Sequence, residues 1–206
     1  MIRLDHLIHA VADRDAAAAA LRDATGLAAL PGGAHPAWGT RNAIVPLGGA
    51  YLELVTVADA ARAGESAFGR AVRDGAASGA LVGFAVEPDD FDATCARAGV
   101  DQQRGARERP DGSVLSWSMA GAEEAIPRGL PFFLRWDDPA SNPARAVAPH
   151  APGVEPTGIA WLSWPTDPAV LDAWLGGPGH GLPIRHGAPA AAIALRGGGE
   201  VPIAVS

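Results

Sequence analysis

Two side chains in the first third of the sequence have the chemistry of a metal site or an acid–base site. His6 lies in the apolar run at residues 1–11, and Glu53 lies in the strongly β-prone run at residues 51–57. A neutral imidazole and a carboxylate are ligands of divalent transition metals, and both also transfer protons. A buried histidine and glutamate can equally form a hydrogen-bonded pair that only holds two strands together. Their chemistry alone therefore leaves both uses open.

Alternation along the first strand separates its two histidines. Successive side chains of a strand point to opposite faces, so His6 shares a face with Leu4 and Ile8. Asp5 and His9 are expected on the other face, where His9 is a structural histidine or a partner of Asp5. An unpaired imidazole is costly to bury, so His6 needs a partner from elsewhere in the chain.

A polar segment punctuated by glycines, residues 32–42, carries three further candidates. His35 is a candidate catalytic residue, Trp38 offers an apolar wall, and Asn42 offers both a donor and an acceptor to a substrate. The small residues of the segment let the backbone approach a ligand closely. The pattern is compatible with a ligand-binding segment and with a plain loop.

Three side chains on predicted strands complete the candidate substrate-binding set. Tyr51 shares a face with Glu53 and is also a candidate for proton transfer. Trp117 is a candidate for substrate contact, although aromatic residues at such strand positions are more often part of the core. Arg135 interrupts an apolar strand, so it either extends to solvent or faces a cavity and binds an anionic group.

A recurring order of strand, helix and further strands must position these residues. It covers residues 1–57 and again residues 80–136, with a helical connector at 58–79. A linker rich in Pro, Ala and Asp at residues 137–156 leads to a third, shortened copy at 157–206. Repetition of one supersecondary unit is itself a signal of architecture.

Composition narrows the class of protein and of ligand. The 206 residues are 48% hydrophobic and 19% charged, which is typical of a globular protein. The net charge of −7 disfavours nucleic acid and anionic membranes as partners. No apolar run approaches the length of a membrane span, and the N-terminus lacks the apolar core of a signal peptide, so a cytoplasmic location is expected.

Two absences exclude whole kinds of chemistry. The sequence contains no lysine, which removes Schiff-base catalysis and the lysine of a phosphate-binding loop. Its single cysteine, Cys95, permits neither an intramolecular disulfide nor a cysteine-based zinc site. The glycine run at residues 197–199 opens no helix, so no nucleotide cofactor is expected.

Several segments together resemble the glyoxalase-like branch of the vicinal oxygen chelate superfamily. They are Leu-Asp-His-Leu at residues 4–7, and the segments at 33–43, 51–54 and 132–137. The resemblance spans nearly the whole chain and is most specific at residues 32–55. It implies an α+β fold in which repeated βαβββ modules form curled mixed sheets around a pocket. It also implies a divalent metal that binds two vicinal oxygens of the substrate and stabilises enolate-like charge.

The family's metal ligands carry over only in part. His6 matches the first-strand ligand and Glu53 the fourth-strand ligand. The second module has residues 81–83 and 133–135, Leu-Val-Gly and Phe-Leu-Arg, where its two ligands would be expected. A divalent ion (Zn, Fe, Mn or Ni) would therefore bind through His6, Glu53 and a loop residue such as His35.

Two functions follow from the resemblance and its gaps. One is a metal-dependent lyase, isomerase or dioxygenase that acts on a small oxygenated molecule. The other is a metal-free protein that binds or sequesters a small molecule on the same fold. The expected partner is a small-molecule ligand, and a homodimer is the open alternative to a monomer.

Overall fold

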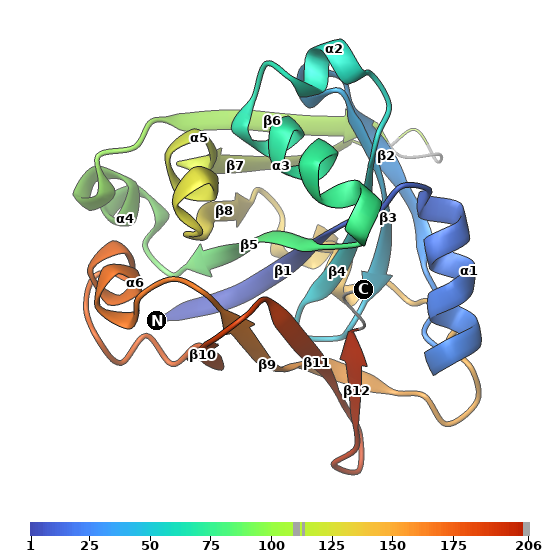
Figure 1. Ribbon diagram of the computed structural model, residues 1–206. Coiled ribbons are helices and arrows are strands. Elements are labelled where there is room, and N and C mark those ends of the chain that lie inside the picture. Colours follow the sequence, from blue (N-terminus) through green and yellow to red (C-terminus); the bar gives the residue numbers. More distant parts are fainter. Residues whose placement is uncertain (109–111, 113, 204–206) are drawn as a thin grey trace.

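An eight-stranded mixed sheet forms the body of the protein, and a four-stranded sheet packs beside it (Figure 1). The computed structural model describes residues 1–108, 112 and 114–203. The last residues of the third predicted module, 204–206, lie outside this description. The large sheet curls and carries helices, so the expected α+β class with a curled mixed sheet is confirmed.

The large sheet has two halves with the same internal order. β1 pairs in parallel with β4 and β5 pairs in parallel with β8, while β1 and β5 join the halves in antiparallel fashion. In spatial order the strands are β2 (Leu30–His35), β3 (Thr40–Pro46), β4 (Tyr51–Val57), β1 (Ile2–Ala10), β5 (Leu81–Pro88), β8 (Phe132–Trp136), β7 (Val114–Ala120) and β6 (Gln102–Glu108).

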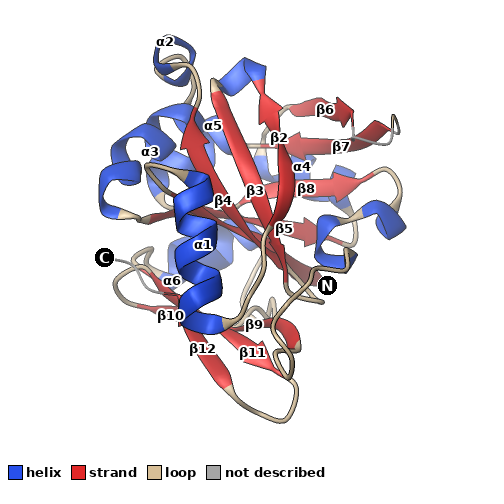
Figure 2. Cartoon of the chain, turned by 90° about the vertical axis from the view of Figure 1, so that its right-hand side faces the viewer, coloured by secondary structure: helices blue, strands red, loops and turns tan. Residues whose placement is uncertain are grey.

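The sheet curls until its two edge strands come close to each other. β2 and β6 stand at opposite ends of the strand order, yet they are in contact (Figure 2). The inner side chains of the strands between them therefore converge, as in a half-barrel. The βαβββ modules expected from the resemblance imply both edge strands, but the residue pattern did not locate either of them.

Helices cover the sheet, and all of the described α-helices except α5 begin at a side-chain cap. The side chain of Asp13 accepts from two backbone N–H groups at the start of α1, and α1 packs against β3 and β4 (Figure 2). No helix in the described residues is long and apolar enough to cross a membrane. The α-helices are α1 (Arg14–Thr25), α2 (Ala60–Ala63), α3 (Ala67–Gly75), α4 (Phe91–Ala98), α5 (Ala122–Ala125) and α6 (Pro168–Leu175).

The third segment of the chain packs on the large sheet. Trp164 meets Phe84 of β5 at 5.2 Å between ring centroids, and Trp174 of α6 stacks on Phe133 of β8 at 5.3 Å. These contacts fill one side of the second half of the large sheet. The strands of the small sheet, in spatial order, are β10 (Ile184–His186), β9 (Pro156–Trp164), β11 (Ala190–Leu195) and β12 (Glu200–Ile203).

Candidate functional site

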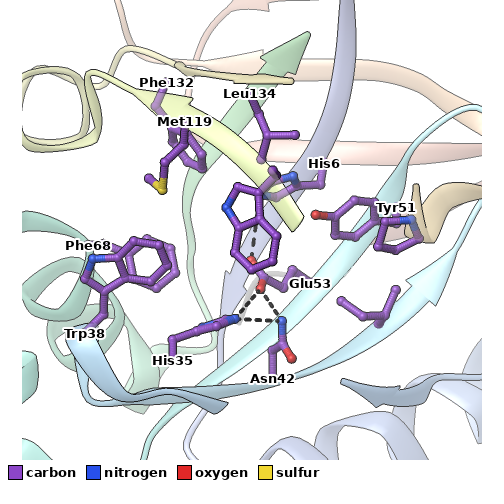
Figure 3. Close-up of a pocket in the computed structure, with 13 residues that line it drawn as sticks. His6, His35, Trp38, Asn42, Tyr51, Glu53, Phe68, Met119, Phe132 and Leu134 are labelled. Atoms are coloured by element: carbon purple, nitrogen blue, oxygen red, sulfur yellow. Dashed lines mark hydrogen bonds and ion pairs between the residues drawn. The ribbon is translucent and has the colours of Figure 1, made fainter. Parts of the chain in front are cut away.

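A pocket with an empty volume of about 510 Å³ lies inside the curl of the large sheet (Figure 3). Its imidazole, amide, phenol and carboxylate groups come from the first half of that sheet. His6 stands on β1, His35 on β2, Asn42 on β3, and Tyr51 and Glu53 on β4. The structure thus brings together residues that the sequence places up to forty-seven positions apart, the interval from His6 to Glu53.

The opposite wall of the pocket is apolar and comes from the second half of the sheet. Trp117 and Met119 project from β7, and Phe132 and Leu134 project from β8. Leu134 stands in the segment where the family pattern would place a carboxylate. The pocket therefore has one polar side and one apolar side, each built by a different half of the sheet.

His6 is held by a buried carboxylate that does not itself line the pocket. Its Nδ1 lies 2.7 Å from Oδ1 of Asp5, whose Oδ2 accepts from Trp136 Nε1 at 2.8 Å and from Asn142 Nδ2 at 3.0 Å. A carboxylate only accepts, so the network assigns the ring proton of a neutral His6 to Nδ1. The lone pair on Nε2 is then left for the pocket. The ring of Tyr51 stacks on His6 at 4.6 Å and fixes its plane.

A β-bulge explains why Asp5 reaches His6. The pairing of β1 with β5 shifts register between Leu4 and His6, which breaks simple alternation at Asp5. Asp5 is consequently a partner of its neighbour and not of His9. The backbone carbonyl of Gly79 accepts from His9 Nε2 at 2.8 Å, and burial lowers the pKa of His9 more than this bond raises it.

Glu53 is oriented by an amide that is itself fixed. Asn42 Nδ2 donates a short hydrogen bond to Glu53 Oε1, and Asn42 Oδ1 accepts from the backbone N–H of Gly33 at 2.6 Å. A Cβ atom at Gly32 would overlap Asn42 Oδ1, so this position needs glycine. The second carboxylate oxygen, Oε2, lies 3.7 Å from His6 Nε2.

His35 lies beside the other oxygen of the same carboxylate. Its Nε2 is 3.9 Å from Glu53 Oε1 and 3.5 Å from Asn42 Nδ2, and its Nδ1 is 3.1 Å from Thr40 Oγ1. The ring packs edge-on against Trp38 at 5.5 Å. His35 and His6 therefore flank Glu53 from two sides (Figure 3).

The donors present do not fit a resident metal centre of the four-ligand kind. Of the family's ligand positions, only those of His6 and Glu53 hold a donor, because the second half of the sheet presents Leu134 and its apolar neighbours. Asn42 already occupies one oxygen of Glu53. Among residues 1–108, 112 and 114–203, no group of three or more His, Cys, Asp or Glu side chains is arranged to hold a metal ion. Metal binding by His6 and Glu53 stays a prediction from the sequence.

Arg135 does not join the other predicted residues. Leu134 faces the pocket, and the next side chain along β8 points the other way. The guanidinium of Arg135 donates to Asp92 Oδ2 at 3.0 Å and lies over the ring of Phe91 at 4.7 Å. Its environment is the surface of α4, so a substrate in the pocket is out of its reach.

Sequence reasoning also missed residues that shape the site. Met119 follows Trp117 by two positions, so strand alternation was a usable signal for it. Phe68 of α3 packs against Trp38 at 5.3 Å between ring centroids. Its place in the pocket had no signal in the sequence, because a helical connector does not show which of its residues face the sheet. Further lining residues that were not anticipated are Ile44, Phe132, Leu134 and Pro143.

Solved structures align with this chain at low sequence identity. A hypothetical protein from Staphylococcus aureus aligns over 96% of this chain and 83% of its own, with 13% identity and a TM-score of 0.62. Methylmalonyl-CoA epimerase from Mycobacterium tuberculosis aligns over 65% of this chain and 86% of its own, with 22% identity and a TM-score of 0.44. No curated protein matches the chain.

A family model covers most of the chain. The model for the glyoxalase-like domain matches residues 4–175, which include both halves of the large sheet and helix α6. This range also contains every residue that lines the pocket. The chain therefore belongs to the glyoxalase-like domain family of the vicinal oxygen chelate superfamily.

Proposed function

We propose that the protein is an enzyme of the isomerase or lyase type that binds a small oxygenated molecule in this pocket and uses Glu53 as its general base. The observation that carries the proposal is the asymmetry of the Glu53 carboxylate. Oε1 is fixed by Asn42, whereas Oε2 has no hydrogen-bond donor among the described residues and faces the pocket. A base that is held by one oxygen and free at the other is oriented toward a substrate.

The surroundings of Glu53 suit proton transfer. Its side chain is only 7% exposed, so water competes little with a bound substrate. In the proposed step, Oε2 takes a proton from a substrate carbon next to a carbonyl group. The electron pair of the broken C–H bond moves into that carbonyl. Return of the proton to another carbon or to the other face completes an isomerisation, and departure of a leaving group completes an elimination.

The flanking histidines have distinct places in this scheme. His6 Nε2 lies beside Oε2, where it can exchange a proton with the same substrate atoms. His35 Nε2 lies beside Oε1 and the Asn42 amide, so its first effect is on the orientation of the base. Of the reaction classes expected from the sequence, isomerisation and elimination need only such proton carriers. Oxygen insertion would need a redox metal in addition.

A binding protein without turnover is the second candidate, and the aromatic lining favours it. Five aromatic rings line the pocket, from Trp38, Tyr51, Phe68, Trp117 and Phe132. Aromatic surface of this kind binds a ligand body whether or not a reaction follows.

The cytoplasmic location and the homodimer stay predictions from the sequence.

Hydrogen–deuterium exchange at carbon tests the proposed function without knowledge of the product. The untagged protein is incubated in D₂O with small carbonyl compounds, and loss of the C–H signal is followed by NMR. We expect exchange in the wild type and a loss of about 10²–10⁴-fold in Glu53→Gln, which removes the base and keeps its shape. Glu65→Gln is the matched control, because Glu65 pairs with Arg62 on the surface.

Three results separate the candidates. Exchange that survives in Glu53→Gln would contradict the assigned base. Ligands that change the tryptophan fluorescence of the wild type but show no exchange would favour the binding protein. Stoichiometric metal in the purified protein, with exchange lost on chelation and regained on addition of that metal, would support the metal-dependent enzyme expected from the sequence.

A further inference from the structure

The polar side of the pocket presents acceptors. Asp5 holds the proton of a neutral His6 on Nδ1, so Nε2 offers a lone pair. Oε2 of Glu53 offers another, 3.7 Å away. Two acceptors at this separation share no proton directly, since the distance exceeds hydrogen-bond length. A donor group of a ligand placed between them would be able to contact both.

Among the described residues, the basic side chains next to these buried carboxylates are histidines: His6 lies against Asp5 and Glu53, and His35 lies against Glu53. Asp5 is 2% exposed and Glu53 is 6% exposed, yet none of the residues that line the pocket is an arginine, and the chain has no lysine. A buried charge without a counter-charge is unfavourable. The charge of Asp5 also contributes, after burial, to the raised pKa of Glu87. A cation in the pocket would supply Glu53 with the permanent counter-charge that an arginine or lysine would give.

The walls of the pocket suit an organic cation. The faces of aromatic rings attract ammonium groups, and Trp38, Phe68 and Phe132 line the same pocket as Glu53 (Figure 3). Trp117 is a further aromatic residue of its lining. A bare metal ion gains less from these apolar walls, and the described residues offer it no three-ligand group. Aromatic walls and a carboxylate together match a small amine with an apolar body.

A second hollow next to the pocket is also lined by acidic side chains. It adjoins the pocket, because Trp38 and Met119 line both. Arg70 lies 3.9 Å from one of its acidic side chains, and the other two make no ion pair in the part of the chain that the structure describes. The acidic residues of this hollow are Asp101, Glu123 and Glu124. An anion that approached along this side would meet repulsion, and a cation would be attracted.

We propose that the pocket selects small organic ammonium ions, held between His6 Nε2 and Glu53 Oε2 with their apolar body against the aromatic walls. The proposal names the substrate class of the enzyme proposed above and rests on that function for its use in catalysis. The positive charge of such a substrate would also offset the negative charge that develops when Glu53 removes a proton nearby.

Three probes of similar shape and different charge test the selection. Benzylammonium, benzyl alcohol and benzoate are titrated into the untagged protein by calorimetry, with tryptophan fluorescence as a second readout. We expect benzylammonium to bind about tenfold more tightly than benzyl alcohol, and benzoate to bind least. In Glu53→Gln the preference for the cation over the alcohol should disappear, while Glu65→Gln should retain it.

The adjacent hollow is tested through the rate of association. The double variant Asp101→Asn/Glu124→Gln should slow the association of benzylammonium by a few-fold at low salt, with less effect at high salt. The double variant should leave the association rate of benzyl alcohol unchanged. Equal slowing of both probes would contradict a role of these charges in selection.

The outcomes distinguish this proposal from the proposed function. Equal affinity for the cation and the alcohol, together with carbon exchange that needs Glu53, would overturn the charge selection and leave the enzyme intact. Preference for the cation without any exchange would support the selection and contradict the general base. One Zn²⁺ bound per chain, lost in His6→Ala and blocking no ammonium probe, would assign the acceptors to a metal and overturn the proposal.

Discussion

His6 shows how one residue acquires its role from a neighbour. Its Nδ1 is bound by Asp5, and the other oxygen of Asp5 is bound by Trp136 and Asn142. These partners come from β1, β8 and the segment after β8. The side chain of His6 faces the pocket and is thus braced by residues that do not themselves line the pocket. We describe Asp5 as a positioning residue, since it acts through His6.

Replacement of Asp5 by asparagine should weaken this brace. One oxygen becomes an NH₂ group, which must face either the indole and amide donors or the ring N–H of His6. We expect a loss of about 1–3 kcal/mol in the free energy of unfolding, because a buried donor is left without an acceptor. Urea denaturation measures the loss, and the imidazole ¹⁵N shifts of His6 report whether the proton still resides on Nδ1.

Asp23→Asn is the matched control for this change. Asp23 is exposed on helix α1, so the free energy of unfolding of the Asp23→Asn variant should stay within about 0.5 kcal/mol of that of the wild type. If Asp5→Asn were as stable as the control and left the His6 tautomer unchanged, the positioning role would be contradicted.

Residue types pointed to the polar side chains that line the pocket, but they did not point to the residues that hold those side chains in place. His6 and Glu53 stand out because each interrupts an apolar strand, and the strands' alternation places their side chains. The role of Asp5 depends on a bulge, which arises only when β1 pairs with β5. The position of Arg135 depended on which face of β8 turns inward, and the sequence left that choice open.

At the scale of elements, the two strands whose residues the sequence pattern did not locate are the two edges of the sheet. β2 contains Pro31, Gly32 and Gly33, and β6 is a run of polar and charged residues with one glycine and one alanine. An edge strand pairs on one side only, so it tolerates proline and glycine, and charge protects its free side. Their strand conformation comes from pairing with β3 and β7, which local propensity does not express.

The end of β1 is joined to the turn after α3 by His9, and this link should make stability depend on pH. Burial lowers the pKa of His9 below its ordinary value of 6.5, so the unfolded chain takes up a proton before the folded chain does. Stability is therefore retained above about pH 6.5 and lost as the pH falls below it. We expect the free energy of unfolding to fall between about pH 7 and pH 5.

His9→Gln separates this effect from general acid sensitivity. Glutamine keeps an N–H donor for the Gly79 carbonyl but does not titrate, so the fall should become shallower. It should not vanish, because burial also lowers the pKa of His150, whose Nδ1 accepts from the Ala28 backbone N–H. Identical pH profiles of the variant and the wild type, measured by urea denaturation, would contradict the assignment to His9.

At the scale of the whole molecule, the third segment supports the pocket without entering it. None of the residues that line the pocket lies beyond the linker, yet Trp164 and Trp174 both reach the large sheet. Trp174 Nε1 also donates to the carbonyl of Pro131 at 2.7 Å, directly before β8. The third segment therefore acts on the position of β8 from the side away from the ligand.

Truncation of Trp174 should lower stability far more than it changes binding. Trp174→Ala removes a ring that is 8% exposed and stacks on Phe133, so we expect a loss of about 3–5 kcal/mol in the free energy of unfolding. Trp161→Ala is the control, because Trp161 is only half-buried and contacts Glu200 and Arg185 near the surface. Calorimetric unfolding should rank the two variants in that order, and the reverse order would contradict this role of Trp174.

The two-sided construction of the pocket has a consequence for how such a protein changes. One half of the large sheet holds every group that can move a proton, and the other half holds Trp117, Met119, Phe132 and Leu134. Random variation confined to those four positions would change which molecules fit, while Glu53, the proposed base, and its flanking histidines stay unchanged. A protein that evolved from this chain could thus change its ligand specificity without a change of reaction.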